Sequence, residues 1–306
     1  MTSYLIAMAT IAAIYGLMVL ALNIMWGMAG LVNFGIAGFF AVGAYTSALT
    51  VLVLNWPIWL GLLSGGAMTA GLAALTCAGL RGLRNDYFAI VTLGFTEVIR
   101  LISENEIWLT RGTDGISGIP QPFKRYLGAD FNLFYLVLCL MILGLAYFVA
   151  ERLRTSPFGR TLRALRDDPQ VAAVAGKPVG RFQIKAFALG GALIGIAGAL
   201  YAHYTSYISP ELFVPLLTLY VFLAATTGGR GNNSGAVVGS FAVIFFLEST
   251  RFATEILPFL TPVQVAAGRG MLIGILFLLV LTVRPHGLLK EPVPHFSDPT
   301  AKRKAI

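Results

Sequence analysis

The sequence contains little charge. Only 12% of its 306 residues are Asp, Glu, Lys or Arg, whereas 57% are hydrophobic, and the mean hydropathy is +0.78. Soluble domains carry about 25% charged residues. The shortage of charge therefore excludes a soluble globular protein of ordinary composition and indicates an integral membrane protein.

Residue types that build catalytic and metal centres are also scarce. Three histidines lie near the ends of apolar runs or in the tail, and two cysteines lie inside apolar runs: His203, His286, His295, Cys77 and Cys139. No catalytic triad, Cys/His pair or metal cluster can be assembled from them, and buried cysteines behave as small hydrophobic residues. The neighbours Asp167 and Asp168 would point in different directions on a helix. We expect a chain that is not an enzyme and binds no metal and no cofactor of its own.

A nucleotide-binding motif is missing as well. Residues 228–235 read GGRGNNSG, but a phosphate loop requires Lys followed by Ser or Thr after its last glycine. The net charge of +8 does not indicate nucleic acid, because the basic residues fall at the ends of apolar runs, as orientation in a bilayer requires. We therefore expect the chain to contact membrane lipid and not nucleic acid.

Long apolar runs are what the chain does contain. They predict membrane spans at residues 4–26, 31–54, 56–80, 88–102, 131–150, 184–204, 213–227, 236–257 and 265–283. Because a membrane-spanning backbone must satisfy its own polar groups, we expect an all-α, polytopic helical bundle of about nine spans, eight to ten given two short runs. Residues 1–290 are predicted to form one transmembrane domain, and residues 291–306 a basic cytoplasmic tail.

The interval 151–185 sets the expected orientation. It carries eight basic residues: Arg152, Arg154, Arg160, Arg163, Arg166, Lys177, Arg181 and Lys185. Cytoplasmic loops are rich in Lys and Arg, so this loop, the C-terminus and the tail are predicted to be cytoplasmic. The N-terminus and the loop 103–130, which has more acidic than basic residues, are predicted to lie outside.

Helix-breaking residues divide the predicted cytoplasmic loop into two short helices. Ser156-Pro157 can begin the first helix and Pro169 interrupts it, while Gly176 ends the second. The charges could serve only to anchor the loop to anionic lipid. A docking surface explains the alternation of helix and breaker better, because a plain basic run would suffice for lipid.

Small and polar residues are concentrated at the start of the second run, LVNFGIAGFFAVGAY. Its glycines favour a face for close helix packing. The alternative is a broken segment that lines a passage, because irregular backbone at membrane depth is tolerated only around cavities. A polar residue inside an apolar run, such as Asn33, is typical of a broken segment that lines a passage.

Charged residues inside spans form the pattern E-x-x-R-x-x-x-E at residues 97–104 and again at 248–255. At this spacing the charges can pair along one helix face. Either they are local ion pairs, or the two copies flank the outer end of a passage as a parallel repeat. Glu97 and Glu248 could also be proton or ion sites of an ion-coupled transporter, because intramembrane carboxylates are functional candidates.

Six sequence stretches, in order, carry a resemblance to a known family. They are LVNFGIAGFFAVGAY, LRNDYFAIVTLGFTEVIRL, LTRGTDGISGIP, SPFGRTLRALRDDPQVAAVAGKPVGRFQIKAFALGGALIGIAGALYAHY, TGGRGNNSGAVVGS and VRPHGLL. Over nearly its whole length the chain resembles the LivM-type permease subunits of ABC importers for branched-chain amino acids. Importers of urea and short amides use near relatives, so the substrate stays open.

The resemblance implies a bacterial inner-membrane heterodimer with a LivH-type permease. Two cytoplasmic ATPase subunits, which hold ATP and Mg²⁺, and a periplasmic binding protein would complete the importer. It also implies that the cytoplasmic loop contains the helix that docks on an ATPase. Many ABC permeases place a Glu before the paired alanines, whereas Asp168 and Gln170 flank that position here, so the acidic contact stays open.

Three sets of candidate residues follow. The ATPase-coupling residues are Arg160, Arg163, Arg166, Asp167, Asp168, Ala172, Ala173 and Gly176. The candidates for the translocation pathway are Asn33, Phe34, Gly35, Tyr45, Thr92, Glu97, Arg100, Thr226, Thr227, Glu248 and Arg251. The candidates for docking of the binding protein are Arg111, Thr113 and Asp114.

Overall fold

The apolar runs form helices in the computed structural model of this protein, which describes residues 2–250, 262–284 and 287–292. The long helices are α1 (Thr2–Leu22), α3 (Ile58–Gly79), α4 (Asn85–Asn105), α7 (Phe131–Thr155), α10 (Val179–Thr205) and α14 (Pro262–Val283). The shorter ones are α2 (Ile36–Leu52), α8 (Pro157–Asp167), α9 (Pro169–Val174), α11 (Pro215–Gly228) and α12 (Asn233–Ser249). A π-helical turn, η1 (Asn23–Met28), extends α1.

Single helical turns and two short strands are the remaining secondary-structure elements of the described residues. They are α5 (Ile107–Thr110), η2 (Gly112–Asp114), β1 (Ile116–Ser117), α6 (Lys124–Leu127), η3 (Gly128–Asp130), β2 (Tyr207–Ile208) and η4 (Pro210–Phe213). β1 and β2 pair antiparallel, with Ile116 opposite Ile208. The pair joins the loop after α4 to the segment after α10.

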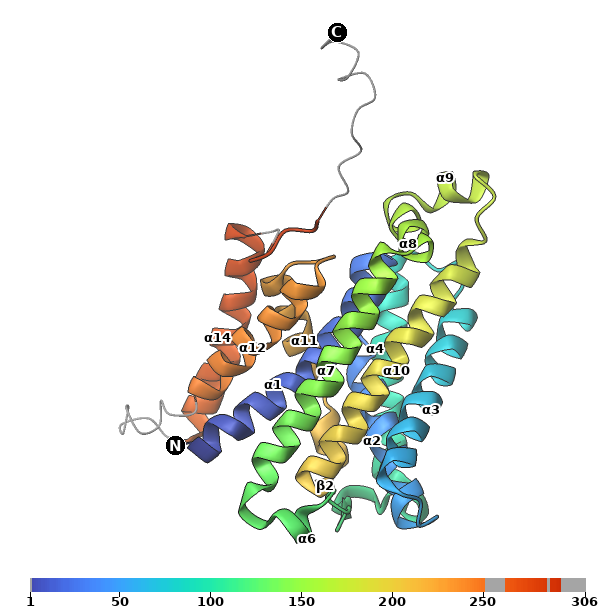
Figure 1. Cartoon of the computed structure of the whole chain (residues 1–306). Coiled ribbons are helices and arrows are strands. Elements are labelled where there is room, and N and C mark those ends of the chain that lie inside the picture. The colour runs from blue at the N-terminus through green and yellow to red at the C-terminus, as the bar shows by residue number, and fades with distance from the viewer. Residues whose placement is uncertain (1, 251–261, 285–286, 293–306) are drawn as a thin grey trace.

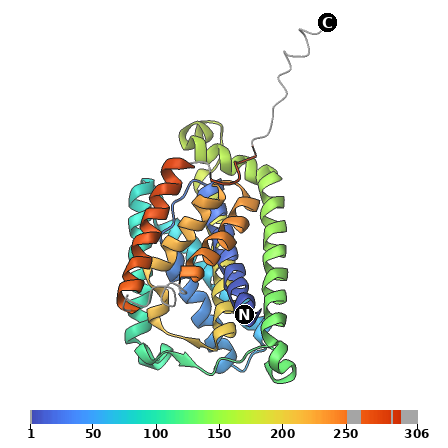
Figure 2. The ribbon, with the colours of Figure 1, turned by 90° about the vertical axis from the view of Figure 1, so that its left-hand side faces the viewer.

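Each of the nine predicted runs contains one of the described helices, which confirms the all-α, polytopic bundle. Four of them are long and apolar enough to cross a membrane, and α2, α11, α12 and part of α14 are shorter apolar helices. Figure 1 shows these helices side by side, with α8 and α9 at one end and α6 and β2 at the other. We call these the knuckle end and the loop end; Figure 2 shows the same ends from the side.

Two spans are broken, and they are broken from opposite ends. After η1 the chain is not helical over residues 29–35, which enter from the knuckle end before α2 continues toward the loop end. After α10, residues 206–214 enter from the loop end as β2 and η4 before α11 continues toward the knuckle end. We call these segments break 1 and break 2.

The two breaks belong to an inverted repeat. The order long helix, break, short helix, helix, helix occurs in α1 to α4 and again, running the opposite way, in α10 to α14. The packing agrees with this repeat, in which α10 corresponds to α1 and α12 to α3. In the first case α1 packs on α12, and in the second α10 packs on α3. The described helices thus form an inverted repeat and not the predicted parallel one, because α4 corresponds to α14 and not to α12. The first E-x-x-R copy lies on α4 and the second begins at the end of α12, and residues 251–255 of the second copy lie outside the described residues.

Glycines allow the central helices to touch. An added Cβ on Gly195 of α10 would lie 2.5 Å from the carbonyl oxygen of Gly65 on α3, and one on Gly43 of α2 would overlap Gly195. Similarly, Gly198 lies against the backbone of Phe40. The second predicted span is thus both a packing face and a broken segment; that the break lines a passage stays a prediction.

Gly198→Ala should therefore lower stability. The new methyl group would overlap the carbonyl oxygen of Phe40, and overpacking costs about 1–3 kcal/mol. The same change at Gly71 of α3, where nothing lies within 4 Å, is the matched control. Thermal aggregation in detergent should shift to lower temperature for Gly198→Ala only. Equal behaviour of the two variants would contradict this packing.

Candidate functional site

The loop 151–185 forms the two short helices that its sequence predicts, α8 and α9, and we call this pair the knuckle. The Ser156 hydroxyl caps α8 by accepting a hydrogen bond from the amide of Gly159 at 3.2 Å, and Pro157 follows at the first helical position. The Asp168 carboxylate caps α9 in the same way, with the amides of Gln170 and Val171 at 2.9 and 3.0 Å. Gly176, with φ of +75°, then turns the chain back.

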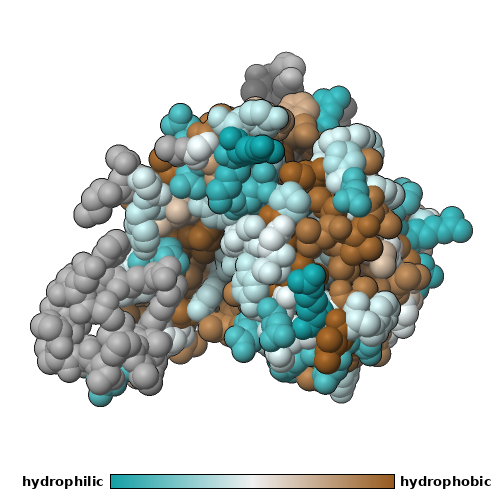
Figure 3. Space-filling model, turned by 90° about the horizontal axis from the view of Figure 1, so that it is seen from below, coloured by the Kyte–Doolittle hydropathy of each residue, from teal (hydrophilic) through white to brown (hydrophobic). Residues whose placement is uncertain are grey.

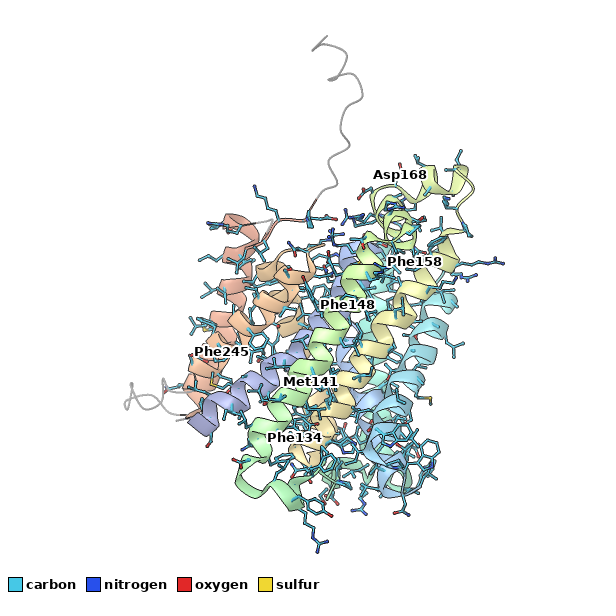
Figure 4. The ribbon with its side chains drawn as sticks, viewed as in Figure 1. Phe134, Met141, Phe148, Phe158, Asp168 and Phe245 are labelled. Carbon is cyan, nitrogen blue, oxygen red and sulfur yellow. The ribbon has the colours of Figure 1, made fainter. Side chains whose placement is uncertain are left out.

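The outward surface of the knuckle is partly apolar. Val171 and Val174 on α9 are 65% and 91% exposed, although α9 lies beyond the ends of the spans. Figure 4 shows Asp168 at the tip of this end of the molecule. Exposed apolar side chains on a short, capped helix are typical of a protein contact. Sequence reasoning missed both valines, although two apolar residues within a polar loop were a usable signal.

The predicted ATPase-coupling residues divide into two groups. Arg160, Asp167, Asp168, Ala173 and Gly176 are exposed. Ala172 is buried within the knuckle, and Arg163 is half-buried with its Nη2 3.5 Å from the carbonyl oxygen of Arg154. The exposed group, together with Val171 and Val174, forms the surface that a partner can reach.

Arg166 points into the bundle instead. Its side chain is 16% exposed, and its Nη1 donates to the carbonyl oxygen of Gly27 in η1 at 2.5 Å and to the Glu291 carboxylate at 3.0 Å. Burial alone would lower the pKa of Arg166, but the bonds to Glu291 and Asp167 offset it and hold the pKa above its ordinary value. Arg166 thus stays charged and attaches the knuckle to the start of break 1.

Polar side chains bind the turn after α11 to η1. Asn23 donates to the side chain of Asn233 at 2.9 Å and accepts from the amide of Gly231 at 2.8 Å. The guanidinium of Arg230 lies over the Trp26 ring at 4.7 Å. The glycine-rich turn therefore has a structural partner in η1.

Break 1 is held by hydrogen bonds from side chains of other helices. The Thr92 and Thr96 hydroxyls of α4 accept from the amides of Phe34 and Gly38 at 3.0 and 3.3 Å. Asn33 is fully buried and accepts from the amide of Gly35 at 2.8 Å. Since each unsatisfied group in the membrane costs several kcal/mol, these bonds make the break possible.

The other predicted pathway residues are spread over the bundle. Phe34 packs against Phe222 of α11 with ring centroids 4.7 Å apart. Tyr45 and Thr227 have buried hydroxyls without a hydrogen-bond partner among the described residues. The Thr226 hydroxyl donates to the carbonyl oxygen of Phe222 within α11, and the Glu248 carboxylate accepts from the Tyr4 hydroxyl at 3.2 Å. Neither hydrogen bond reaches break 1. Arg251 lies outside the described residues.

α4 exposes charge along its length. Arg100 donates to the Glu104 carboxylate at 2.9 Å and pairs with Glu97, as the spacing predicts. The Glu97 side chain is nevertheless 44% exposed, midway along a helix whose Ile90 and Val98 are also exposed. A charged group on a lipid-facing surface is costly, so this face needs water or a protein partner.

α7 presents the opposite kind of surface. Met141 and Phe148 are 65% and 66% exposed, and Figure 4 shows them with Phe134 along one side of α7. Apolar side chains of this kind suit contact with lipid. The contrast marks α4, and not α7, as the face that requires a polar neighbour.

The loop 103–130, which we call the outer loop after its predicted side of the membrane, is hydrogen-bonded to break 2. The amide of Ile119 donates to the carbonyl oxygen of Ser206 at 3.3 Å, beside the β1–β2 pair. His203 lies 2.7 Å through Nδ1 from the carbonyl oxygen of Pro120 and 3.0 Å through Nε2 from the Ser47 hydroxyl. Because a carbonyl only accepts, Nδ1 carries the proton and Nε2 accepts from Ser47.

The predicted docking residues of this loop are accessible. Arg111, Thr113 and Asp114 are exposed at the loop end. Figure 3 looks onto this end and shows hydrophilic residues beside a hydrophobic area. These three residues therefore lie on a surface that a partner can reach.

These features define a multi-pass membrane protein with broken spans, an exposed knuckle at one end and a hydrogen-bonded loop at the other. A family model described as "Branched-chain amino acid transport system / permease component" matches residues 4–281. LivM of Escherichia coli (strain K12), a high-affinity branched-chain amino acid transport system permease protein, is 30% identical over 94% of this chain and 70% of its own length.

Two further relatives agree. The probable LivM of Methanocaldococcus jannaschii is 29% identical over 95% of this chain and 94% of its own length. LivH of Salmonella typhimurium is 24% identical over 92% of this chain and 93% of its own length. No solved structure matches the chain. The chain belongs to the branched-chain amino acid transport permease family and is of the LivM type.

Loss of the α9 cap should loosen the knuckle. Asp168→Ala removes the acceptor for two amides, and loss of such a cap costs about 1 kcal/mol. Hydrogen exchange at the amides of Gln170 and Val171 should become several-fold faster. Asp167→Ala, which removes an equal charge next to it but no cap, is the control. If both variants exchange alike, Asp168 is not the cap.

Proposed function

We propose that the chain is the transmembrane subunit of an ATP-binding-cassette importer, coupled to cytoplasmic ATPase subunits through the knuckle. The observation that supports this most is the exposure of Val171 and Val174 on α9, a capped helix outside the spans. Such a helix fits a groove on another protein. The chain has no nucleotide motif of its own, so ATP hydrolysis belongs to the partner.

The transported substrate is a branched-chain amino acid. The names of the relatives favour this class over the urea or short amides that the resemblance left open. A periplasmic binding protein delivers the substrate to the loop end, where Arg111, Thr113 and Asp114 are exposed. The knuckle end, which carries the basic residues of α8, faces the cytoplasm.

A second, LivH-type permease faces α4 across the pathway. The Glu97–Arg100–Glu104 ion pairs are partly exposed, and Glu97 and Arg100 lie within the predicted span 88–102. A water-filled passage between two permeases satisfies these charges better than lipid. The pathway candidates Asn33, Phe34, Gly35 and Thr92 hold the break beside this helix.

An ion-coupled transporter is the alternative. It would require carboxylates that take up and release an ion during transport. Glu97 is paired with Arg100, and Glu248 accepts from Tyr4. Both acids therefore have local partners, which favours a structural role for each.

Val174→Asp tests the ATPase contact. A charge placed in a buried interface should weaken binding of the purified ATPase subunits about tenfold or more, as at interface hot spots. Val53→Asp at the loop end, where the valine is 68% exposed, is the control. Affinity is measured with detergent-solubilised permease. Unchanged affinity for Val174→Asp would remove the knuckle from the contact.

Single cysteines test the orientation. Because Cys77 and Cys139 are buried, new exposed cysteines can be labelled selectively. Asp114→Cys should react with an impermeant thiol reagent in intact cells, or in spheroplasts if there is an outer membrane. Val174→Cys should react only after permeabilisation of the cytoplasmic membrane. The opposite pattern would invert the orientation.

The pathway face is tested in the same way. Val98→Cys on α4 should react with a charged methanethiosulfonate reagent, because the proposed passage contains water. Leu145→Cys on α7, where the leucine is 65% exposed to the expected lipid, should react much more slowly. Equal rates at the two positions would argue against a passage along α4.

A further inference from the structure

The short helices that follow the two breaks, α2 and α11, touch each other deep in the bundle. The hydroxyl of Thr218, in the first turn of α11, accepts a hydrogen bond from the amide of Ala37, in the first turn of α2, at 3.2 Å. Both residues are buried, with exposed fractions of 1% and 0%. The contact therefore joins the short helices that follow break 1 and break 2.

Break 1 is attached to the knuckle. Arg166 of α8 donates to the carbonyl oxygen of Gly27 at 2.5 Å, and its Cγ would lie 3.0 Å from a Cβ on Gly30. Gly30 has φ of +75°, a conformation that favours glycine. A displacement of α8 would therefore be passed to the segment that leads into α2.

Break 2 is attached to the outer loop. Ile208 pairs with Ile116, and the Ser206 hydroxyl donates to the carbonyl oxygen of Ile119 at 2.7 Å. The Tyr207 hydroxyl donates to the carbonyl oxygen of Asp114 at 3.2 Å. A displacement of the outer loop would be passed to the segment that leads into α11.

We infer that Thr218 is a positioning residue that links the outer docking loop to the ATPase-docking knuckle. The links run from the outer loop to break 2, across the Thr218–Ala37 hydrogen bond to α2 and break 1, and through Arg166 to α8. Energetic coupling between distant sites is carried by such contiguous networks. The inference rests on the proposed function, because it needs a binding protein at one end and an ATPase at the other.

Three substitutions separate this role from a purely structural one. Thr218→Val keeps the shape and removes the hydroxyl, whereas Thr218→Ser keeps the hydroxyl. Thr69→Val is the matched control, because Thr69 is also buried and its hydroxyl bonds only within α3 among the described residues, to Gly65. Each variant is assembled with its partner permease and ATPases in proteoliposomes.

The measurement is ATP hydrolysis with and without leucine-loaded binding protein. Thr218→Val should keep basal hydrolysis and lose stimulation by about fivefold or more, the lower end of the range for coupling between sites. Thr218→Ser and Thr69→Val should be stimulated like the parent. Normal stimulation of Thr218→Val, or equal losses in Thr218→Val and Thr69→Val, would overturn the inference.

Failure of the proposed function would look different. In that case the parent chain itself would not assemble with ATPases, or its hydrolysis would not respond to the binding protein. If Thr218→Val alone does not assemble, the same ratio is measured for Ala37→Pro, which removes the amide hydrogen at an early helical position. Stimulation retained in that variant would also overturn the inference.

Discussion

The structure depends on one constraint, which is that a backbone inside a membrane must find partners for all its polar groups. Residues 29–35 are not helical, and all but the first two of them lie within the predicted span 31–54. They are tolerated because Asn33, Thr92, Thr96 and Thr218 accept hydrogen bonds from amides in or next to the break. These partners come from α4 and α11 as well as from the break itself. The same hydroxyls that satisfy break 1 therefore also fix how the helices around it are arranged.

Local chemistry made the knuckle predictable. Ser156-Pro157, Pro169 and Gly176 are capping and breaking residues whose effects extend over one helical turn. The structure places α8 and α9 within a residue of the predicted limits. The helices of the nine apolar runs were predictable for a similar reason, because an apolar run that enters a bilayer must satisfy its own backbone polar groups and therefore forms a helix. The ion pairs of Arg100 also follow from spacing along one helix.

Contacts between distant residues were not predictable from these rules. The partner of Arg166 is Glu291, and the partner of Asn23 is Asn233, each far along the chain. Nothing in local spacing distinguishes Arg166 from the exposed Arg160. The inverted repeat was missed because the E-x-x-R pattern suggested the wrong pairing of helices. The packing of α10 on α3 and of α1 on α12 shows the correct one.

The proposed function requires that this permease works only as part of an ATP-driven assembly. It is tested by isolating the tagged chain in mild detergent and identifying the associated proteins and their stoichiometry by mass spectrometry. We expect one LivH-type permease and two ATPase subunits for each copy of this chain. Isolation of the chain by itself, active in proteoliposomes with an ion gradient and no ATP, would contradict it.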